Sequence, residues 1–237
     1  MTRTKLCDRV LPDYTRGEEL MNMITHIVGG ALGVVVLLSC VIRAALRDNY
    51  FGILSCTIYG TTFITMFTIS SVYHGLAPGM SKKVMQVIDH CTIYLLIGGT
   101  YTPILFCAIR PLSPVWAWGI FAAVWGCAIT AAVFTAIDLK KYEKLSMACY
   151  IGAGWCIILA AKITIEAIGP AGFGWLLAGG IIYTIGGIIY ALKLPIFNEK
   201  HKYFGSHEIF HLFVMGGSVC HFIVMYVFVA GMPLSIL

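Results

Sequence analysis

Runs of about twenty apolar residues follow one another along this 237-residue chain, separated by short polar breaks. A helix that rises about 1.5 Å per residue needs about twenty such residues to cross a hydrocarbon core of about 30 Å. A transmembrane β-barrel would instead alternate apolar and polar residues in segments of roughly ten. The runs therefore predict an all-α, polytopic membrane protein.

The composition excludes other classes. The chain is 59% hydrophobic and only 11% charged, whereas soluble chains carry about 25% charged residues. Its net charge of +5 is scattered through the connections and forms no basic stripe. A soluble domain and a nucleic-acid-binding protein are both excluded by this pattern.

We expect a bundle of seven transmembrane helices. The predicted spans are residues 24–42, 51–72, 84–109, 115–137, 145–168, 173–194 and 210–231. Twelve of the 16 Lys and Arg residues fall on the side that holds the N-terminus. Because Lys and Arg flanking the spans stay on the cytoplasmic side, the N-terminus is predicted to be cytoplasmic and the C-terminus outside.

Residues 1–23 are predicted to form a short cytoplasmic arm, and residues 24–237 the seven-helix domain. The arm is not a signal peptide, because Glu18, Glu19 and Asn22 interrupt the place where an apolar core should begin. Glycine clusters, such as Gly29 with Gly33 and Gly152 with Gly154, predict close packing between helices.

Ionisable side chains in or beside a span indicate function, because each costs a few kcal/mol at the bilayer centre. In the predicted orientation, several lie together at the cytoplasmic face. They are His26, His74, Asp89, His90, His207 and His211. This concentration predicts a polar site at that end of the bundle.

The strongest local signal is the string HEIFH at residues 207–211. Two histidines four residues apart share a helix face and can bind one metal ion. His74, at the same depth on another span, would be the third ligand and leave a fourth position for water. Three imidazoles fit zinc better than magnesium or calcium.

Glu208 has two interpretations. In the pattern H-E-x-x-H it would be the general base of a zinc protease. It could equally be a first-turn acid that the helix dipole stabilises. Asp89 is the other carboxylate expected at this depth, where it could orient water or take its proton. Alternatively, Asp89 pairs with His90 or Lys82.

The remaining polar residues are assigned by their spacing. Ser70 precedes His74 by four residues, so its hydroxyl should face the metal. Asn22 and His26 belong to a polar helix start that we expect to form a structural hydrogen-bond cluster. His221 lies roughly 15 Å beyond His211 along the helix and is expected to be a buried hydrogen-bonding residue.

These residues resemble the hemolysin III family of bacterial membrane proteins, relatives of the progestin and adipoQ receptors in a superfamily that includes alkaline ceramidases. The resembling strings are EELMNMITH at 18–26, SSVYH at 70–74, DHCTIY at 89–94, GTYTP at 99–103 and SHEIFH at 206–211, with His221 downstream. They cover nearly the whole chain.

The resemblance implies a multi-pass protein of the bacterial cytoplasmic membrane, with zinc near the cytoplasmic face on His74, His207 and His211. It further implies that Ser70 and Asp89 accompany the metal, and that the substrate is a lipid amide or ester. Glu208 matches a Gln in adiponectin-receptor-like members, which favours Asp89 as the acid/base residue. Since the long N-terminal domain of the animal receptors has no counterpart here, we expect no protein hormone as partner.

Three functions remain open from the sequence. The first is a zinc-dependent lipid hydrolase. The second is a sensor of membrane composition, or receptor-like protein, whose zinc only ties two spans together. The third is a cytolysin or channel, which the apolar spans disfavour because they offer no rows of polar residues to line a pore. An open metal position beside a cavity for an acyl chain would favour the hydrolase.

Overall fold

The structure is a computed structural model that describes residues 4–192 and 205–234. Every element in these ranges is helical. The elements are η1 (Leu6–Asp8), α1 (Arg16–Ala45), α2 (Tyr50–Gly75), α3 (Met80–Pro103) with η2 (Ile104–Ile109), α4 (Pro114–Ile137), α5 (Glu143–Trp155), η3 (Cys156–Ala160), α6 (Ala161–Leu192), and α8 (Ser206–Ile223) with η4 (Val224–Val229). The end of the predicted span 173–194 and the basic residues Arg3, Lys193, Lys200 and Lys202 lie outside the described ranges.

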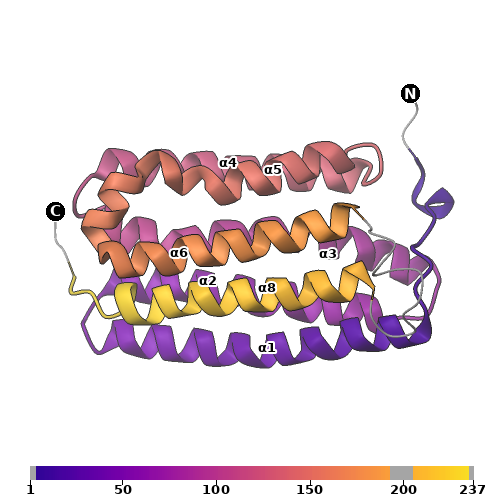
Figure 1. Cartoon of the computed structure of the whole chain (residues 1–237), viewed down its shortest axis with the longest axis horizontal. Helices are drawn as coiled ribbons and strands as arrows, with labels where there is room; N and C mark the ends of the chain where they lie inside the picture. The colour runs from indigo at the N-terminus through magenta and orange to yellow at the C-terminus, as the bar shows by residue number, and fades with distance from the viewer. Residues whose placement is uncertain (1–3, 193–204, 235–237) are drawn as a thin grey trace.

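Within the described ranges, six helical stretches are long and apolar enough to cross a membrane. One of them, Glu143–Leu192, has 50 residues, about 75 Å if it were one straight helix. It is interrupted at Gly169, whose φ of 72° and ψ of 166° are not helical, and Pro170 follows. The chain turns back at the end of the bundle opposite the N-terminal arm (Figure 1). Trp155 Nε1, at the end of α5, donates a hydrogen bond to Thr184 Oγ1 of α6 at 3.0 Å.

Capping residues set the helix boundaries, which extend beyond the predicted spans. α1 begins at Arg16 because Thr15 and Glu18 form a capping box, in which each side chain bonds the other's backbone N–H. Residues 16–23 of the predicted arm are therefore helical. α2 begins after Asn49, whose side chain accepts a hydrogen bond from Gly52 N at 2.8 Å.

Glycines bring α1 and α2 close together, as expected. A Cβ at Gly29 would lie 2.1 Å from the Phe67 ring, and one at Gly33 would lie 2.9 Å from the Phe63 ring. The expectation was wrong for Gly152 and Gly154, because no atom of the described residues on a neighbouring helix lies within 4 Å of a Cβ at either. They face open space and contribute no close helix contact.

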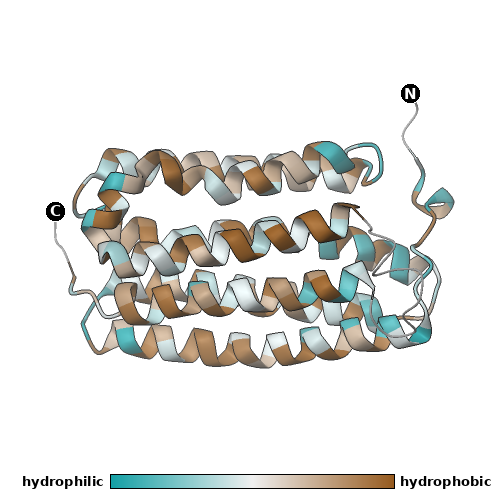
Figure 2. Cartoon of the chain, in the orientation of Figure 1, coloured by the Kyte–Doolittle hydropathy of each residue, from teal (hydrophilic) through white to brown (hydrophobic). Residues whose placement is uncertain are grey.

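Hydrophobic residues dominate the middle of the bundle, and hydrophilic residues gather at its two ends and in the N-terminal arm (Figure 2). α1 and α8 both begin at the end that carries the arm, and α2 finishes there (Figure 1). This arrangement places the first turns of α1 and α8 beside the last turn of α2. The polar residues of these turns form the candidate site.

Candidate metal centre

His74, His207 and His211 meet at one end of the bundle. One ligand atom from each lies within 4.8 Å of the others. His74 ends α2, where it is 3% exposed, and His211 is equally buried on α8. The ring centroids of His207 and His211, four residues apart, are 4.4 Å apart. The trio therefore joins two helices that are far apart in sequence.

The geometry of the trio fits a divalent metal such as zinc. The Nε2 atoms of His74 and His207 are 3.2 Å apart. Zinc–nitrogen bonds of about 2.0–2.1 Å at a tetrahedral angle imply about 3.3 Å between two ligand nitrogens. The His211 ring is buried and forms a hydrogen bond with the backbone of Asn22 on α1, which orients it within the trio.

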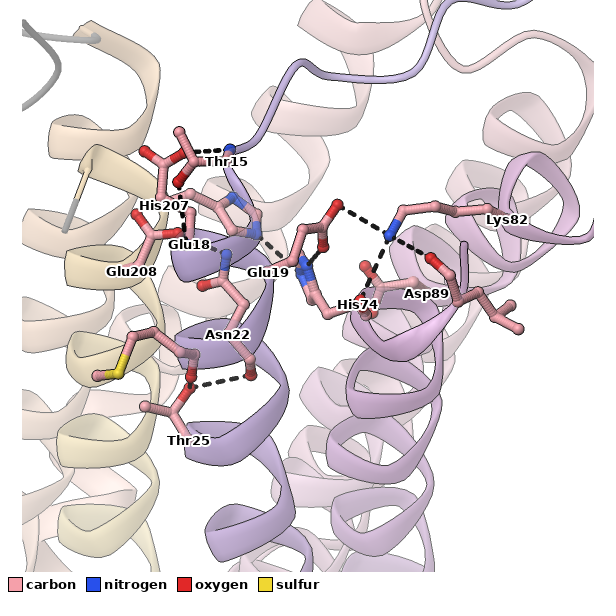
Figure 3. A network of polar contacts seen from close by, with 12 residues as sticks. Thr15, Glu18, Glu19, Asn22, Thr25, His74, Lys82, Asp89, His207 and Glu208 are labelled. Atoms are coloured by element: carbon pink, nitrogen blue, oxygen red, sulfur yellow. Dashed lines mark hydrogen bonds and ion pairs between the residues drawn. The ribbon is translucent and has the colours of Figure 1, made fainter. Parts of the chain in front are cut away.

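A carboxylate outside the trio holds His74 in place. Nδ1 of His74 bonds Oε2 of Glu19 at 2.7 Å, and the other oxygen of Glu19 pairs with Lys82 Nζ at 2.8 Å (Figure 3). The sequence prediction assigned the carboxylates at this depth to Asp89 and Glu208. That prediction was incomplete, because Glu19 is the acid that contacts a histidine of the trio.

Asp89 interacts with both Ser70 and His74. Asp89 is buried, interacts electrostatically with the His74 ring, and accepts a hydrogen bond from the Ser70 side chain. Figure 3 draws Asp89 near His74. Of the two predicted pairings of Asp89, the structure has the contact with His90, whose Nδ1 is 3.8 Å from Oδ2, whereas Lys82 pairs with Glu19.

Glu208 serves the start of α8. It is 1% exposed and accepts hydrogen bonds from the backbone N–H of Gly205 at 2.6 Å and from the Asn22 amide at 2.6 Å. These contacts match the first-turn acid rather than the general base of a zinc protease. Asn22 thereby links α1 to α8, as the predicted structural hydrogen-bond cluster requires.

His26 and His221 are both buried but differ in their relation to the trio. The His26 ring stacks on His211 with centroids 3.6 Å apart. Neither ring nitrogen of His26 has a hydrogen-bond partner among the described residues. His221 packs instead against the Tyr183 ring at 5.0 Å, further along α8, and its Nδ1 has no described partner. The His221 ring also forms a hydrogen bond with the backbone of Leu176, which confirms its prediction as a buried hydrogen-bonding residue.

Two tyrosines cover the trio. The Tyr14 ring, in the N-terminal arm, lies 5.1 Å from the His207 ring and 5.9 Å from the His74 ring. Tyr190 of α6 lies 5.3 Å from His207. Burial raises the pKa of the Tyr14 phenol well above its usual range. Tyr14 therefore stays neutral and forms an apolar cover with a polar tip.

Sequence reasoning did not assign Glu19, Tyr14 or Tyr190 to the metal centre, and it named Lys82 only as an alternative partner of Asp89. For Glu19 a signal existed: Glu19, Asn22 and His26 are spaced three and four residues apart and share one helix face. Only one of the two neighbouring acids, Glu18, is needed for the cap. Nothing local in the sequence places Tyr14 or Tyr190 near the trio.

A cavity of about 290 Å³ between α4 and α5 has a separate lining. Its walls are small and apolar: Ala123, Val124, Cys127, Ala148, Cys149, Gly152, Ala153 and Cys156. None of the histidines of the trio contributes to it.

Comparisons with known proteins agree with the resemblance drawn from the sequence. The family model described as Haemolysin-III related matches residues 14–222. The chain is 36% identical to Hemolysin-3 of Bacillus cereus, with 86% of this chain and 89% of that protein covered. It is 33% identical to the Hemolysin-3 homolog of Bacillus subtilis (strain 168), with 93% and 98% covered.

A more distant relative is an adiponectin receptor protein of Drosophila melanogaster, which is 25% identical over 86% of this chain and 49% of the receptor. No solved structure matches the chain significantly. The family match spans the helices that carry all three histidines of the trio. The chain is thus a multi-pass membrane protein and belongs to the haemolysin-III-related family.

Proposed function

We propose that this protein is a membrane-embedded, zinc-dependent hydrolase that cleaves a lipid amide or ester. The observation that carries the proposal is the trio of His74, His207 and His211, whose ligand atoms lie within 4.8 Å of one another at one end of an apolar bundle. In the part of the chain that the structure describes, the group holds three imidazoles and no further ligand, which leaves a position for water or substrate, as in catalytic zinc sites.

A zinc ion held by the trio would supply a Lewis acid that polarises a carbonyl and lowers the pKa of water. Asp89 is the acid/base residue of the proposal, because its buried carboxylate lies beside His74. There it can accept a proton from the attacking water and return it to the leaving group. Ser70 holds the Asp89 carboxylate through its hydrogen bond.

The proposal includes a topology of seven membrane crossings. Glu143–Leu192 is too long for one crossing and is broken at Gly169, so we assign two crossings to it. The charge count then predicts the N-terminus and the metal centre at the cytoplasmic side of the membrane and the C-terminus outside. Since the arm carries Tyr14 over the trio from this side, a lipid substrate would enter from the bilayer.

A sensor of membrane composition with a structural zinc is the second candidate. It is favoured by the rings that surround the trio, since His26 stacks on His211 and Tyr14 and Tyr190 pack on His207. In addition, no histidine of the trio lines the apolar cavity between α4 and α5. The sensor would bind zinc without turning over any lipid.

The test is hydrolysis by zinc-loaded protein in lipid nanodiscs, with ceramides, other N-acyl lipids and phospholipid esters as substrates and fatty-acid release as the readout. We expect turnover of one of these classes, and loss of about 10²–10⁴-fold in Asp89→Asn, the range for an acid/base residue. Asp48→Asn is the matched control, because Asp48 is exposed in the turn between α1 and α2. Zinc binding without turnover of any class would favour the sensor.

A further inference from the structure

Glu19 bridges two buried nitrogen groups with its two carboxylate oxygens. Oε2 lies 2.7 Å from Nδ1 of His74, and Oε1 lies 2.8 Å from Nζ of Lys82. The His74 side chain is 0% exposed and that of Lys82 is 3% exposed. Glu19 comes from α1, His74 from α2 and Lys82 from α3. The bridge therefore joins the first three helices beside the trio.

Lys82 is fixed by more than its ion pair. Its ammonium also donates hydrogen bonds to the backbone carbonyls of Leu76 at 2.9 Å and His74 at 3.4 Å. It lies 5.0 Å from the centroid of the Tyr73 ring. Lys82 thus caps the C-terminal end of α2, where orphan carbonyls attract cations. Because these contacts fix Lys82, they also fix the Glu19 carboxylate.

We propose that Glu19, held by the buried Lys82, is the positioning residue of the metal centre, and that it presents His74 Nε2 to the metal. The inference rests on the proposed function only in that a metal binds the trio. It assigns to Glu19 and Lys82, which lie outside the trio, the role of determining which ring nitrogen of His74 faces the metal.

The physical argument concerns the tautomer of His74. A neutral imidazole carries one N–H and one lone pair. When a carboxylate accepts the N–H of Nδ1, the lone pair must lie on Nε2, and the ring can no longer rotate freely. In this structure Nε2 of His74 faces His207 Nε2 at 3.2 Å. Glu19 therefore selects the nitrogen that belongs to the trio.

Glu18 makes the matched control, because it is the same residue type one position earlier on α1. Its carboxylate accepts the backbone N–H of Thr15 at 2.7 Å and serves the helix cap. Asp89 is not equivalent to Glu19, since the described contacts of its carboxylate are with Ser70 and His90. Among the described residues, Glu19 is the acid that bonds His74.

The experiment measures the zinc dissociation constant of detergent-purified protein by chelator competition, for the wild type, Glu19→Gln and Glu18→Gln. Thermal unfolding of the zinc-free forms is measured alongside. We expect Glu19→Gln to weaken zinc binding by about 10–100-fold, the usual effect of removing a carboxylate that orients a metal-binding histidine. Glu18→Gln should change zinc binding by less than about threefold. A role in folding alone would instead lower the unfolding temperature and leave the zinc constant unchanged.

Lys82 provides a second variant that keeps the inference falsifiable. In a double-mutant cycle, Lys82→Met should weaken zinc binding in the wild type but have little further effect in Glu19→Gln, because the two act through one contact. Additive effects would overturn the role of Lys82. Zinc binding by Glu19→Gln equal to that of Glu18→Gln would overturn the inference itself, whether or not lipid hydrolysis is found. If the wild type binds no zinc, the proposed function fails together with the inference.

Discussion

At the arm-bearing end of the bundle, some buried polar side chains form hydrogen bonds between helices. Asn22 is fully buried on α1 and donates to Glu208 of α8 at 2.6 Å. Thr25, one turn later, bonds only carbonyls of its own helix, those of Met21 and Asn22. Variants of Asn22 and Thr25 therefore compare a hydrogen bond between helices with hydrogen bonds inside one helix.

Asn22→Ala should destabilise the protein by about 1.5–3 kcal/mol, because it removes a hydrogen bond to a buried carboxylate. Thr25→Ala should cost less than about 1 kcal/mol, since its hydroxyl donates only to carbonyls of α1. Unfolding in mixed micelles, followed by circular dichroism, measures both. Equal costs would show that the link between Asn22 and Glu208 contributes nothing to stability.

Asp138 ties down the N-terminal arm beyond the membrane-spanning helices. Its Oδ2 accepts the backbone N–H of Thr4 at 2.8 Å, and Oδ1 accepts that of Lys141 at 3.2 Å. The Thr4 bond is the main cause that lowers the pKa of Asp138 to about 2. A carboxyl whose pKa is lowered by folding adds stability above its unfolded pKa, and that stability disappears as the pH falls through the folded pKa.

Asp138→Asn should therefore lower the unfolding temperature at pH 6, and by much less at pH 2. The difference between the variants should shrink between pH about 4, the ordinary Asp pKa, and pH about 2. Differential scanning fluorimetry over this range measures it. A difference that stays constant from pH 6 to pH 2 would contradict the assigned role of Asp138.

At the scale of the helices, apolar runs were sufficient to predict where the long helices lie, because the bilayer demands length and hydropathy. In the described part of the chain, however, the predicted spans 145–168 and 173–194 fall in one stretch, Glu143–Leu192. The ends of the helices were harder to predict. α1 starts at Arg16 rather than near Ile24, since the Thr15–Glu18 box extends it into polar sequence. The Glu19–Lys82 bridge and the Tyr14 cover were not predicted, because they depend on how three helices and the arm pack together.

The close contact between α1 and α2 predicts the effect of adding a methyl group at the glycine between them. A Cβ at Gly60 would lie 2.6 Å from Leu37 Cα, a backbone atom that cannot move aside. Gly60→Ala should separate the two helices and cost about 1–3 kcal/mol, the range for overpacking. Gly126→Ala on α4 is the control, because no described neighbour lies within 4 Å of a Cβ built at Gly126. It should be neutral or stabilise by up to about 1 kcal/mol, and equal destabilisation of both variants would contradict the close approach.

At the scale of the whole molecule, the helices bring the first turns of α1 and α8 to the end of α2, so the topology determines which side of the membrane holds the trio. We predict that a reporter fused after Leu237 shows an external location and that one fused before Met1 shows a cytoplasmic location. Paired alkaline phosphatase and fluorescent protein fusions measure both. A cytoplasmic C-terminus would contradict the proposed seven crossings.

The most direct test of the central claim is the metal content of detergent-purified protein by mass spectrometry, without chelators. The comparison is between the wild type, the His207→Ala/His211→Ala double variant, and His90→Ala, whose side chain is 25% exposed and lies outside the trio. The account predicts nearly one zinc per chain in the wild type and in His90→Ala, and almost none in the double variant. Equal zinc in all three, or none in the wild type, would contradict it.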